Sequence, residues 1–354
     1  MQKVAALPKA VGWVVAEQPA LRGYTVEWDE PGDFILSRRD RLYHSPELQP
    51  PFRLLGTFPT APWKPAAAIF RPIQRLLRYM FYNVIKLSDG SLFVTFDRTA
   101  GILRNGRFEL LPIERPCRIL RGGCALDEKG DLFFGEYVYN TGRNLIRIYK
   151  YRSTTHHLDV VHEFPAGSIR HVHGIYYDSF ASALWCCTGD FGNECRIMRT
   201  KDEFRTIETV GGGDETWRCV SLLFNSSGVY YGTDAEFRRN YLYRFDGQTA
   251  ERTVLTEVGG PVYYSRAAGN DLFFGVTAEL CPSQTDRSAT LWHVGPDNTA
   301  ARTACFEKDA LPLRFQFGLL HFPAGAGLPG RLFFHGLALK GADNKTFQVR
   351  RAPK

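Results

Sequence analysis

The segments KGDLFFGEY (residues 129–137) and SSGVYYGTD (residues 226–234) follow one pattern: a turn glycine, three apolar residues, a second glycine and a polar residue. Similar segments recur along the chain: DGSLFVTFD (89–97), SALWCCTGD (182–190), GNDLFFGVTAE (269–279) and PGRLFFHGL (329–337). Short apolar runs bounded by turn residues are typical of strands buried on both faces. The recurring pattern therefore indicates an all-β protein.

The spacing of the copies predicts the architecture. They recur at roughly 40 to 50 residues, and each is followed by a third strand such as IRIYKY (146–151) or YLYRFD (241–246). Four strands per repeat at this period are typical of β-propeller blades. A single blade exposes both faces of its sheet, so apolar residues on both faces are buried only when blades stack around an axis.

We predict a single β-propeller domain over residues 1–354 with seven blades of four antiparallel strands, six blades being the alternative. Six blades are placed at residues 82–113, 117–164, 169–210, 217–258, 261–308 and 314–352, and residues 24–58 supply another. The blade at residues 314–352 lacks a strand. We expect VGWVVAE (11–17) to pair there and close the ring, which removes exposed sheet edges.

One segment departs from the strand pattern. Between residues 66 and 80, apolar residues and arginines recur at helical spacing: Ile69, Ile73, Leu76, Leu77 and Met80, with Arg71, Arg75 and Arg78 on the other face. We expect a short amphipathic helix at one end of the propeller. It either caps the ring or contacts a membrane surface or a partner.

Composition limits the partners and the compartment. The net charge is +7, which favours anionic partners, but no basic run resembles a nucleic-acid-binding tail. The N-terminal segment is a poor secretory signal and no stretch is long and apolar enough to span a membrane, so we expect a cytoplasmic protein. The eight cysteines form no C-x-x-C pair, which favours reduced core residues over a disulfide framework.

The segment TKDEFRTI (200–207) has Thr200, Asp202 and Thr206 at the positions of the Asp-box turn, with Phe204 in place of glycine and Ile207 in place of an aromatic residue. In this feature the chain resembles the sialidase-like (BNR/Asp-box) β-propellers. The resemblance implies the propeller fold and a structural role for the turn. For sialidases it further implies arginines that bind a substrate carboxylate and a Tyr–Glu nucleophile with an aspartic acid/base.

Residues that begin the first strand of each blade are predicted to share a funnel on the axis. Arginine recurs at this position in four blades, and other polar side chains accompany it. The candidate substrate-binding residues are Arg118, Arg121, Arg170, Arg218, Arg314, Gln316 and Tyr263. Such arginines either pair with internal carboxylates that lock the blades together or bind an external anion, because guanidinium matches carboxylate through two parallel hydrogen bonds.

A second set of residues could carry chemistry in the same funnel. The candidate catalytic residues are His171, His173, Tyr264, Glu136, Asp190, Asp234 and Glu279, and Asp97 occupies a similar strand end. His171 and His173 flank Val172, so both side chains face the same side of a strand. They could act as general bases or bind a divalent metal, with Gln316, His335 or Glu136 as further ligands.

Two function classes stay open. One is a carbohydrate-active enzyme that acts on an acidic, carboxylate-bearing glycan or polysaccharide, as a glycosidase through paired carboxylates or as a lyase. The other is a non-catalytic propeller that binds a glycan or a protein partner in polysaccharide biosynthesis. No cofactor is required by the sequence, although a divalent metal fits the histidine pair.

Overall fold

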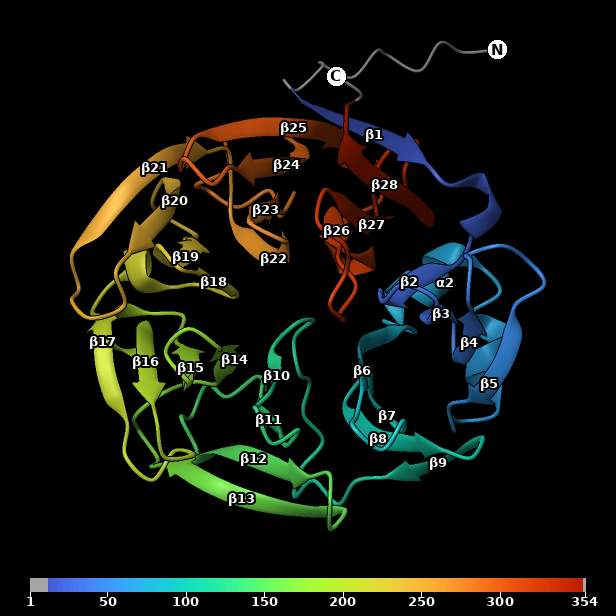
Figure 1. Cartoon of the computed structure of the whole chain (residues 1–354), viewed down its shortest axis with the longest axis horizontal. Coiled ribbons are helices and arrows are strands. Elements are labelled where there is room, and N and C mark those ends of the chain that lie inside the picture. The colour runs from blue at the N-terminus through green and yellow to red at the C-terminus, as the bar shows by residue number, and fades with distance from the viewer. Residues whose placement is uncertain (1–11, 353–354) are drawn as a thin grey trace.

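The computed structural model describes residues 12–352, in which seven four-stranded antiparallel sheets surround a central axis (Figure 1). The seven-bladed prediction is confirmed. Within each blade the first strand lies nearest the axis and the last lies at the rim. The N-terminal segment, which the sequence predicts to be a poor secretory signal, lies partly outside the described residues.

The strands follow the chain in blade order. Blade one comprises β2 (Thr25–Trp28), β3 (Phe34–Arg38), β4 (Arg41–Ser45) and β5 (Arg53–Thr57). Blade two comprises β6 (Phe81–Lys86), β7 (Leu92–Phe96), β8 (Thr99–Arg104) and β9 (Arg107–Leu110). Blade three comprises β10 (Cys124–Leu126), β11 (Leu132–Gly135), β12 (Ile146–Arg152) and β13 (His157–Phe164). Blades four and five comprise β14 (Val172–Asp178), β15 (Ala183–Thr188), β16 (Arg196–Thr200), β17 (Glu208–Gly212); β18 (Leu222–Asn225), β19 (Gly228–Gly232), β20 (Asn240–Phe245), β21 (Arg252–Val258). Blades six and seven comprise β22 (Val262–Ala268), β23 (Asp271–Val276), β24 (Ser288–Val294), β25 (Ala300–Glu307); β26 (Leu319–His321), β27 (Arg331–Leu337), β28 (Lys345–Arg351) and β1 (Trp13–Glu17).

The last blade combines both ends of the chain. Strand β1 pairs antiparallel with β28, from Trp13 opposite Arg351 to Glu17 opposite Phe347. This pairing gives β28 a neighbour on its outer side, so the edge it would otherwise expose is covered.

The hydrophobic core consists of seven clusters, and each cluster lies between two adjacent blades. Strand alternation divides neighbouring side chains between clusters: Cys186 packs toward blade three and Cys187 toward blade five. The repeat glycine makes this stacking close. A Cβ on Gly135 would lie 2.5 Å from the Cβ of Val172 in the next blade, and one on Gly232 would lie 2.5 Å from that of Val262.

The predicted helix near residues 66–80 is present as two short helices, α1 (Trp63–Ala67) and α2 (Arg71–Leu76). They are separated because Phe70 is extended and Pro72, in the first turn of α2, has no N–H to continue an earlier helix. In these helices the charged side is buried and the apolar side is exposed, the reverse of the usual arrangement. Arg75 is only 2% exposed, whereas Ile69, Ile73 and Leu76 face solvent.

The hairpin between β16 and β17 has the bonding expected of an Asp-box turn. Asp202 accepts hydrogen bonds from the Thr206 amide at 2.9 Å, from its hydroxyl at 2.7 Å, and from the Thr200 hydroxyl at 2.8 Å. These bonds lower the pKa of Asp202 to about 2. Phe204, at the glycine position, adopts a positive φ of 69° and is buried in the core between blades three and four.

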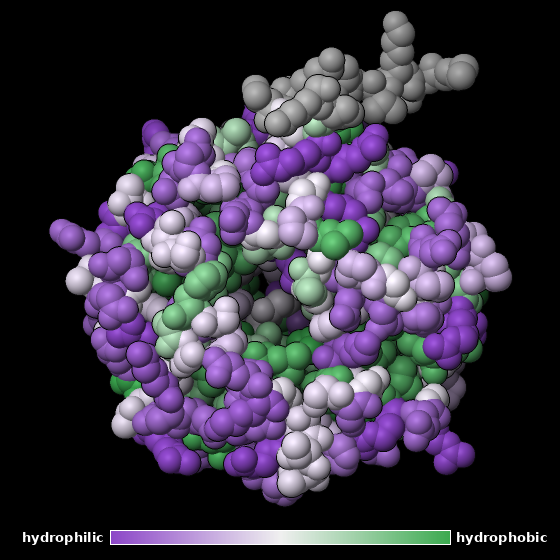
Figure 2. All heavy atoms as spheres, viewed as in Figure 1, coloured by the Kyte–Doolittle hydropathy of each residue, from purple (hydrophilic) through white to green (hydrophobic). Residues whose placement is uncertain are grey.

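One face of the ring carries every connection from an outermost strand to the next innermost strand, because successive strands alternate in direction. We call it the crossover face; it includes residues 58–80, 165–171, 213–221 and 308–318. In the view of Figure 2 the ring is hollowed at its centre, with hydrophobic residues among the polar ones around the hollow. Within residues 12–352, no helix is long and apolar enough to cross a membrane.

Candidate functional site

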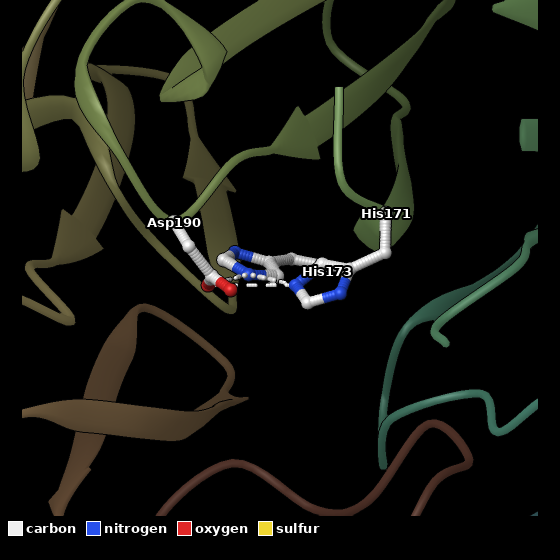
Figure 3. A group of neighbouring side chains, drawn as sticks. All are labelled: His171, His173 and Asp190. Atoms are coloured by element: carbon white, nitrogen blue, oxygen red, sulfur yellow. Dashed lines mark hydrogen bonds and ion pairs between the residues drawn. The ribbon is translucent and has the colours of Figure 1, made fainter. Parts of the chain in front are cut away.

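Three side chains of blade four meet at the crossover-face end of its innermost strand, next to the axis of the ring. His171 and His173 flank the first residue of β14, and Asp190 follows the end of β15. Their potential ligand atoms all lie within 4.8 Å of one another, and all three residues are buried. Figure 3 shows the carboxylate facing both imidazole rings.

Backbone carbonyls fix the tautomer of both histidines. His171 Nδ1 lies 2.9 Å from the Val138 carbonyl oxygen, and His173 Nδ1 lies 2.9 Å from that of Cys219. A carbonyl only accepts hydrogen bonds, so each Nδ1 carries the proton and each neutral ring presents a lone pair at Nε2. The carbonyls come from blade three and from the segment before β18, so three blades position the pair.

The two Nε2 atoms face each other and the same carboxylate oxygen. They are 3.2 Å apart, and they lie 3.4 Å (His171) and 3.3 Å (His173) from Asp190 Oδ1. Around a cation with bonds of about 2.0–2.1 Å in tetrahedral geometry, neighbouring ligand atoms are about 3.3–3.4 Å apart. Burial lowers the pKa of His173, which disfavours a proton between the rings near neutral pH. The trio therefore fits a divalent cation.

Two arginines adjoin the trio through Asp190. Arg170 Nη1 lies 2.7 Å from Asp190 Oδ2, and Arg218 lies 3.4 Å from Oδ1 while its Nε donates to Asp234 at 2.9 Å. Burial raises the pKa of Asp190, but imidazoles protonated at Nε2 would donate to the carboxylate and lower its pKa. When the rings are neutral, pairing with Arg170 and Arg218 favours the ionised form. Asp190 is therefore an anion at neutral pH.

The arginine network is not fully satisfied by the protein. Among the residues that the structure describes, Arg170 Nε and Asp234 Oδ1 are buried without a hydrogen-bond partner. Leaving such groups unpaired is costly, and native structures usually fill them with water or a ligand. One donor and one acceptor of this network are therefore buried without a protein partner.

A second acid lies beside this network. Burial raises the pKa of Glu279, despite the opposing effects of Tyr263 and Arg218, and burial also raises the pKa of Asp234. Burial likewise raises the pKa of Tyr263, which keeps its hydroxyl protonated near neutral pH. The site thus combines an ionised carboxylate with acids whose pKa values are shifted toward neutrality.

Sequence reasoning missed three aromatic residues. The Tyr137 ring lies 4.2 Å from that of His171, and the Arg170 guanidinium lies over the exposed rings of Tyr139, at 4.9 Å, and Phe191, at 5.9 Å. Alternation along the strand end could have indicated Tyr137, because it follows Glu136 and must face the opposite way.

The side chain of Glu136 turns away from the channel. It is fully buried, forms an ion pair with Arg115, and accepts hydrogen bonds from the Tyr149 hydroxyl at 3.1 Å and the Arg147 amide at 3.0 Å. It therefore ties strands together and does not join the histidines.

Other predicted residues also lie apart from the trio. Arg121 is buried in an ion pair with Glu27 at 2.7 Å, and with Tyr264 it lines a separate cavity of about 240 Å³. Arg118 lies 3.5 Å from Asp97, and Arg314 is exposed over its neighbour Phe315. His335 bonds Thr346 within blade seven, and no described contact links Gln316 to the histidines. Of the two alternatives for these arginines, Arg121 therefore follows the first: it pairs with an internal carboxylate.

Comparison with known proteins supports the fold alone. No family model matches the chain, and no curated protein does. Among solved structures, the chain is similar to an oligogalacturonate lyase in complex with manganese, with a TM-score of 0.60, 11% identity, and coverage of 99% of this chain and 96% of that one. It is similar to a chain of the mitotic checkpoint complex (TM-score 0.55, 11% identity, 100% and 98% covered). It also resembles the extracellular domain of a one-component system from B. thetaiotaomicron (TM-score 0.57, 13% identity), covering 97% of this chain but 40% of that one.

Proposed function

We propose that the chain binds a carboxylate-bearing oligosaccharide at the crossover-face mouth of the channel and cleaves it by β-elimination, as a polysaccharide lyase. The observation that carries this proposal is the convergence of Arg170 and Arg218 on the His171–His173–Asp190 trio, with a buried donor and acceptor left unpaired. The name of one structural neighbour, an oligogalacturonate lyase, agrees with this class.

The arginines suit the substrate's carboxylate. Guanidinium groups bind carboxylates through parallel, charge-assisted hydrogen bonds, and Arg170 Nε has no other partner in the described part of the chain. The exposed rings of Tyr139 and Phe191 border Arg170 and offer flat apolar surfaces to a sugar ring. The net charge of +7 attracts an anionic glycan.

Glu279 and Tyr263 are proposed to move the protons. Glu279, with its raised pKa, takes the proton from the carbon next to the substrate carboxylate. The C–H electron pair forms a carbon–carbon double bond, the glycosidic C–O bond breaks, and its electrons pass to the leaving oxygen. Tyr263, protonated near neutral pH, donates the proton that this oxygen takes up.

His171, His173 and Asp190 would hold a divalent cation. When bound, such a cation supplies a Lewis acid that neutralises negative charge on the substrate. Asp190 also keeps Arg170 and Arg218 in place, so the trio and the arginines form one connected site.

A glycosidase is the second candidate, because the site contains carboxyl groups of opposite character. Asp190 has a lowered pKa, whereas Asp234 and Glu279 have raised ones. A hydrolase needs such a division between an ionised carboxylate and a carboxylic acid.

One assay separates the candidates. The protein is incubated with polygalacturonate and with other uronate polysaccharides, with added Mn²⁺ or with EDTA. A lyase yields products with a new double bond that absorbs ultraviolet light, whereas a hydrolase yields reducing ends without it. Binding without either product would overturn the catalytic proposal in favour of a non-catalytic glycan-binding propeller.

Variants test the assigned roles. Glu279→Gln should abolish turnover while retaining glycan binding, and Arg218→Lys should weaken binding because lysine cannot form the bidentate contact. Arg205→Ala, at an exposed residue of the Asp-box hairpin, is the matched control. Full activity of Glu279→Gln would refute its role as the base.

A further inference from the structure

The helical insert on the crossover face exposes mainly apolar side chains; the side chains of Lys64 and Arg71 are partly exposed, at 29% and 23%. Every exposed residue between positions 61 and 76 is apolar. The large ones are Trp63 (57% exposed), Ile69 (61%), Phe70 (66%), Ile73 (38%) and Leu76 (47%), and we call these five the apolar face. Contiguous exposed apolar surface of this kind marks an interaction site in soluble proteins.

Ion pairs hold this orientation. Arg71 forms two hydrogen bonds of 2.9 Å to the Asp343 carboxylate, and Arg75 pairs with Asp309 at 2.5 Å and donates to the Phe315 carbonyl at 3.1 Å. The polar side of α2 is thereby fixed to blade seven, so the apolar side must face outward. Burying the apolar side instead would break these contacts and leave buried charges unpaired.

Exposed cations border the apolar face. Arg38 is exposed and lines the same pocket as Ile69, and Arg314 belongs to η4 (Leu313–Phe315), which packs against α2. Arg98 is exposed next to Asp97, the carboxylate nearest Lys64 of α1. Asp97, Asp309 and Asp343 are already engaged with basic side chains of the insert. An apolar centre with a cationic border complements a bilayer that contains anionic lipids.

The residue types of the apolar face favour a bilayer over a folded partner. The most exposed side chains, Phe70, Ile69 and Trp63, lie at the junction of the two helices and at the start of α1. Large exposed side chains of this kind can enter a fluid lipid interface without a matching groove. Tryptophan and phenylalanine are also typical of side chains that enter the headgroup boundary.

We propose that the apolar face docks the propeller onto a membrane surface containing anionic lipids. The insert connects β5 to β6, so it lies on the crossover face, as does the His171–His173–Asp190 trio. Docking would direct the mouth of the channel toward the bilayer. This inference does not depend on the reaction proposed above.

Co-sedimentation of the full chain with vesicles tests the proposal. Vesicles of phosphatidylcholine alone are compared with vesicles that also contain phosphatidylglycerol, at low and high salt. We expect binding to the phosphatidylglycerol vesicles that weakens with salt, and little binding to phosphatidylcholine. The double variant Trp63→Gln/Phe70→Gln should bind roughly tenfold more weakly or worse, with an unchanged melting temperature because both side chains are exposed.

Phe180→Gln is the matched control. Phe180 is 63% exposed but lies in the β14–β15 connection, on the opposite face, so this variant should bind vesicles like the wild type. Absence of vesicle binding by the wild type, or equal binding by the double variant, would overturn the proposal. So would a dimer in solution that the double variant dissociates, since a second copy of the chain would then cover the apolar face.

Discussion

Two backbone carbonyls determine the chemistry of the histidine pair. Because the Val138 and Cys219 carbonyl oxygens each accept a hydrogen bond from an Nδ1–H group, both Nε2 lone pairs are aimed at the space beside Asp190. A metal-binding histidine usually has such a partner, which sets its tautomer and its orientation. The sequence motif H-x-H gives the shared face, but the carbonyls and the third ligand come from distant segments.

Metal binding follows from this arrangement. Titration calorimetry with Zn²⁺ and Mn²⁺ should show one site per chain for one of the two ions. His173→Ala should weaken that affinity about a hundredfold or more, because it removes one of three ligands. His157→Ala, at an exposed position, should leave affinity unchanged. Equal affinity in His173→Ala would disprove the site.

A histidine outside this pair, His335, makes folding sensitive to acid. Burial lowers the pKa of His335 to about 3 in the folded chain, from 6.5. Between pH 6.5 and 3 the unfolded state binds a proton that the folded state does not, so the free energy of unfolding falls as the pH drops. One such group contributes at most about 1.4 kcal/mol per pH unit.

Chemical denaturation measured across this pH range checks the assignment. His335→Gln should flatten the decline in stability below pH 6.5, whereas His157→Gln should not. An unchanged slope in His335→Gln would show that His335 is not buried in its neutral form.

At the scale of strands, alternation separates what the sequence predicts from what it leaves open. The apolar repeat predicts the blade architecture and the strand order, because each blade must bury both of its faces. It occurs in six copies, so the repeat alone leaves six or seven blades open, and the pairing of β1 with β28 completes the seventh blade. The side chains at strand ends are harder to place: a shift of one residue exchanges Glu136, which faces Arg115, for Tyr137, which faces His171. Likewise the insert's helical period gives no sign that Asp309 and Asp343, distant in sequence, turn its arginines inward.

Gly135, the second glycine of the repeat in blade three, tests whether close packing of the strands positions the histidines. Gly135→Ala places a Cβ against Val172, which lies between the two histidines. We expect β14 to shift and the histidine pair to separate, with a loss of stability of about 1–3 kcal/mol from overpacking. Metal affinity should therefore fall although the substituted residue touches no ligand.

Gly142→Ala provides the comparison, because a Cβ there would meet nothing closer than 3.7 Å. It should preserve both stability and metal affinity. If Gly135→Ala behaved in the same way, the close approach of β14 to this glycine would not be what positions the histidines.

At the scale of the whole molecule, stability is shared around the ring. Each hydrophobic cluster joins two neighbouring blades, so no blade has a core of its own. The ring closes through β1, whose Trp13 is 6% exposed, contacts Phe273 of blade six at 4.9 Å, and lies under the Arg351 guanidinium. The N-terminal strand thus links the last two blades.

This arrangement predicts that a substitution in β1, which closes the ring, lowers the stability of all seven blades together. Trp13→Ala should lower the free energy of unfolding by about 3–5 kcal/mol, as for other large buried aromatic residues, and unfolding should remain a single transition. Val14→Ala, at a neighbouring position that is 36% exposed, should change it by less than about 1 kcal/mol. Calorimetry and tryptophan fluorescence should report one coincident midpoint for each variant. Two separate transitions in Trp13→Ala would mean that blades six and seven unfold independently, because only then could the loss at β1 leave the other interblade clusters intact.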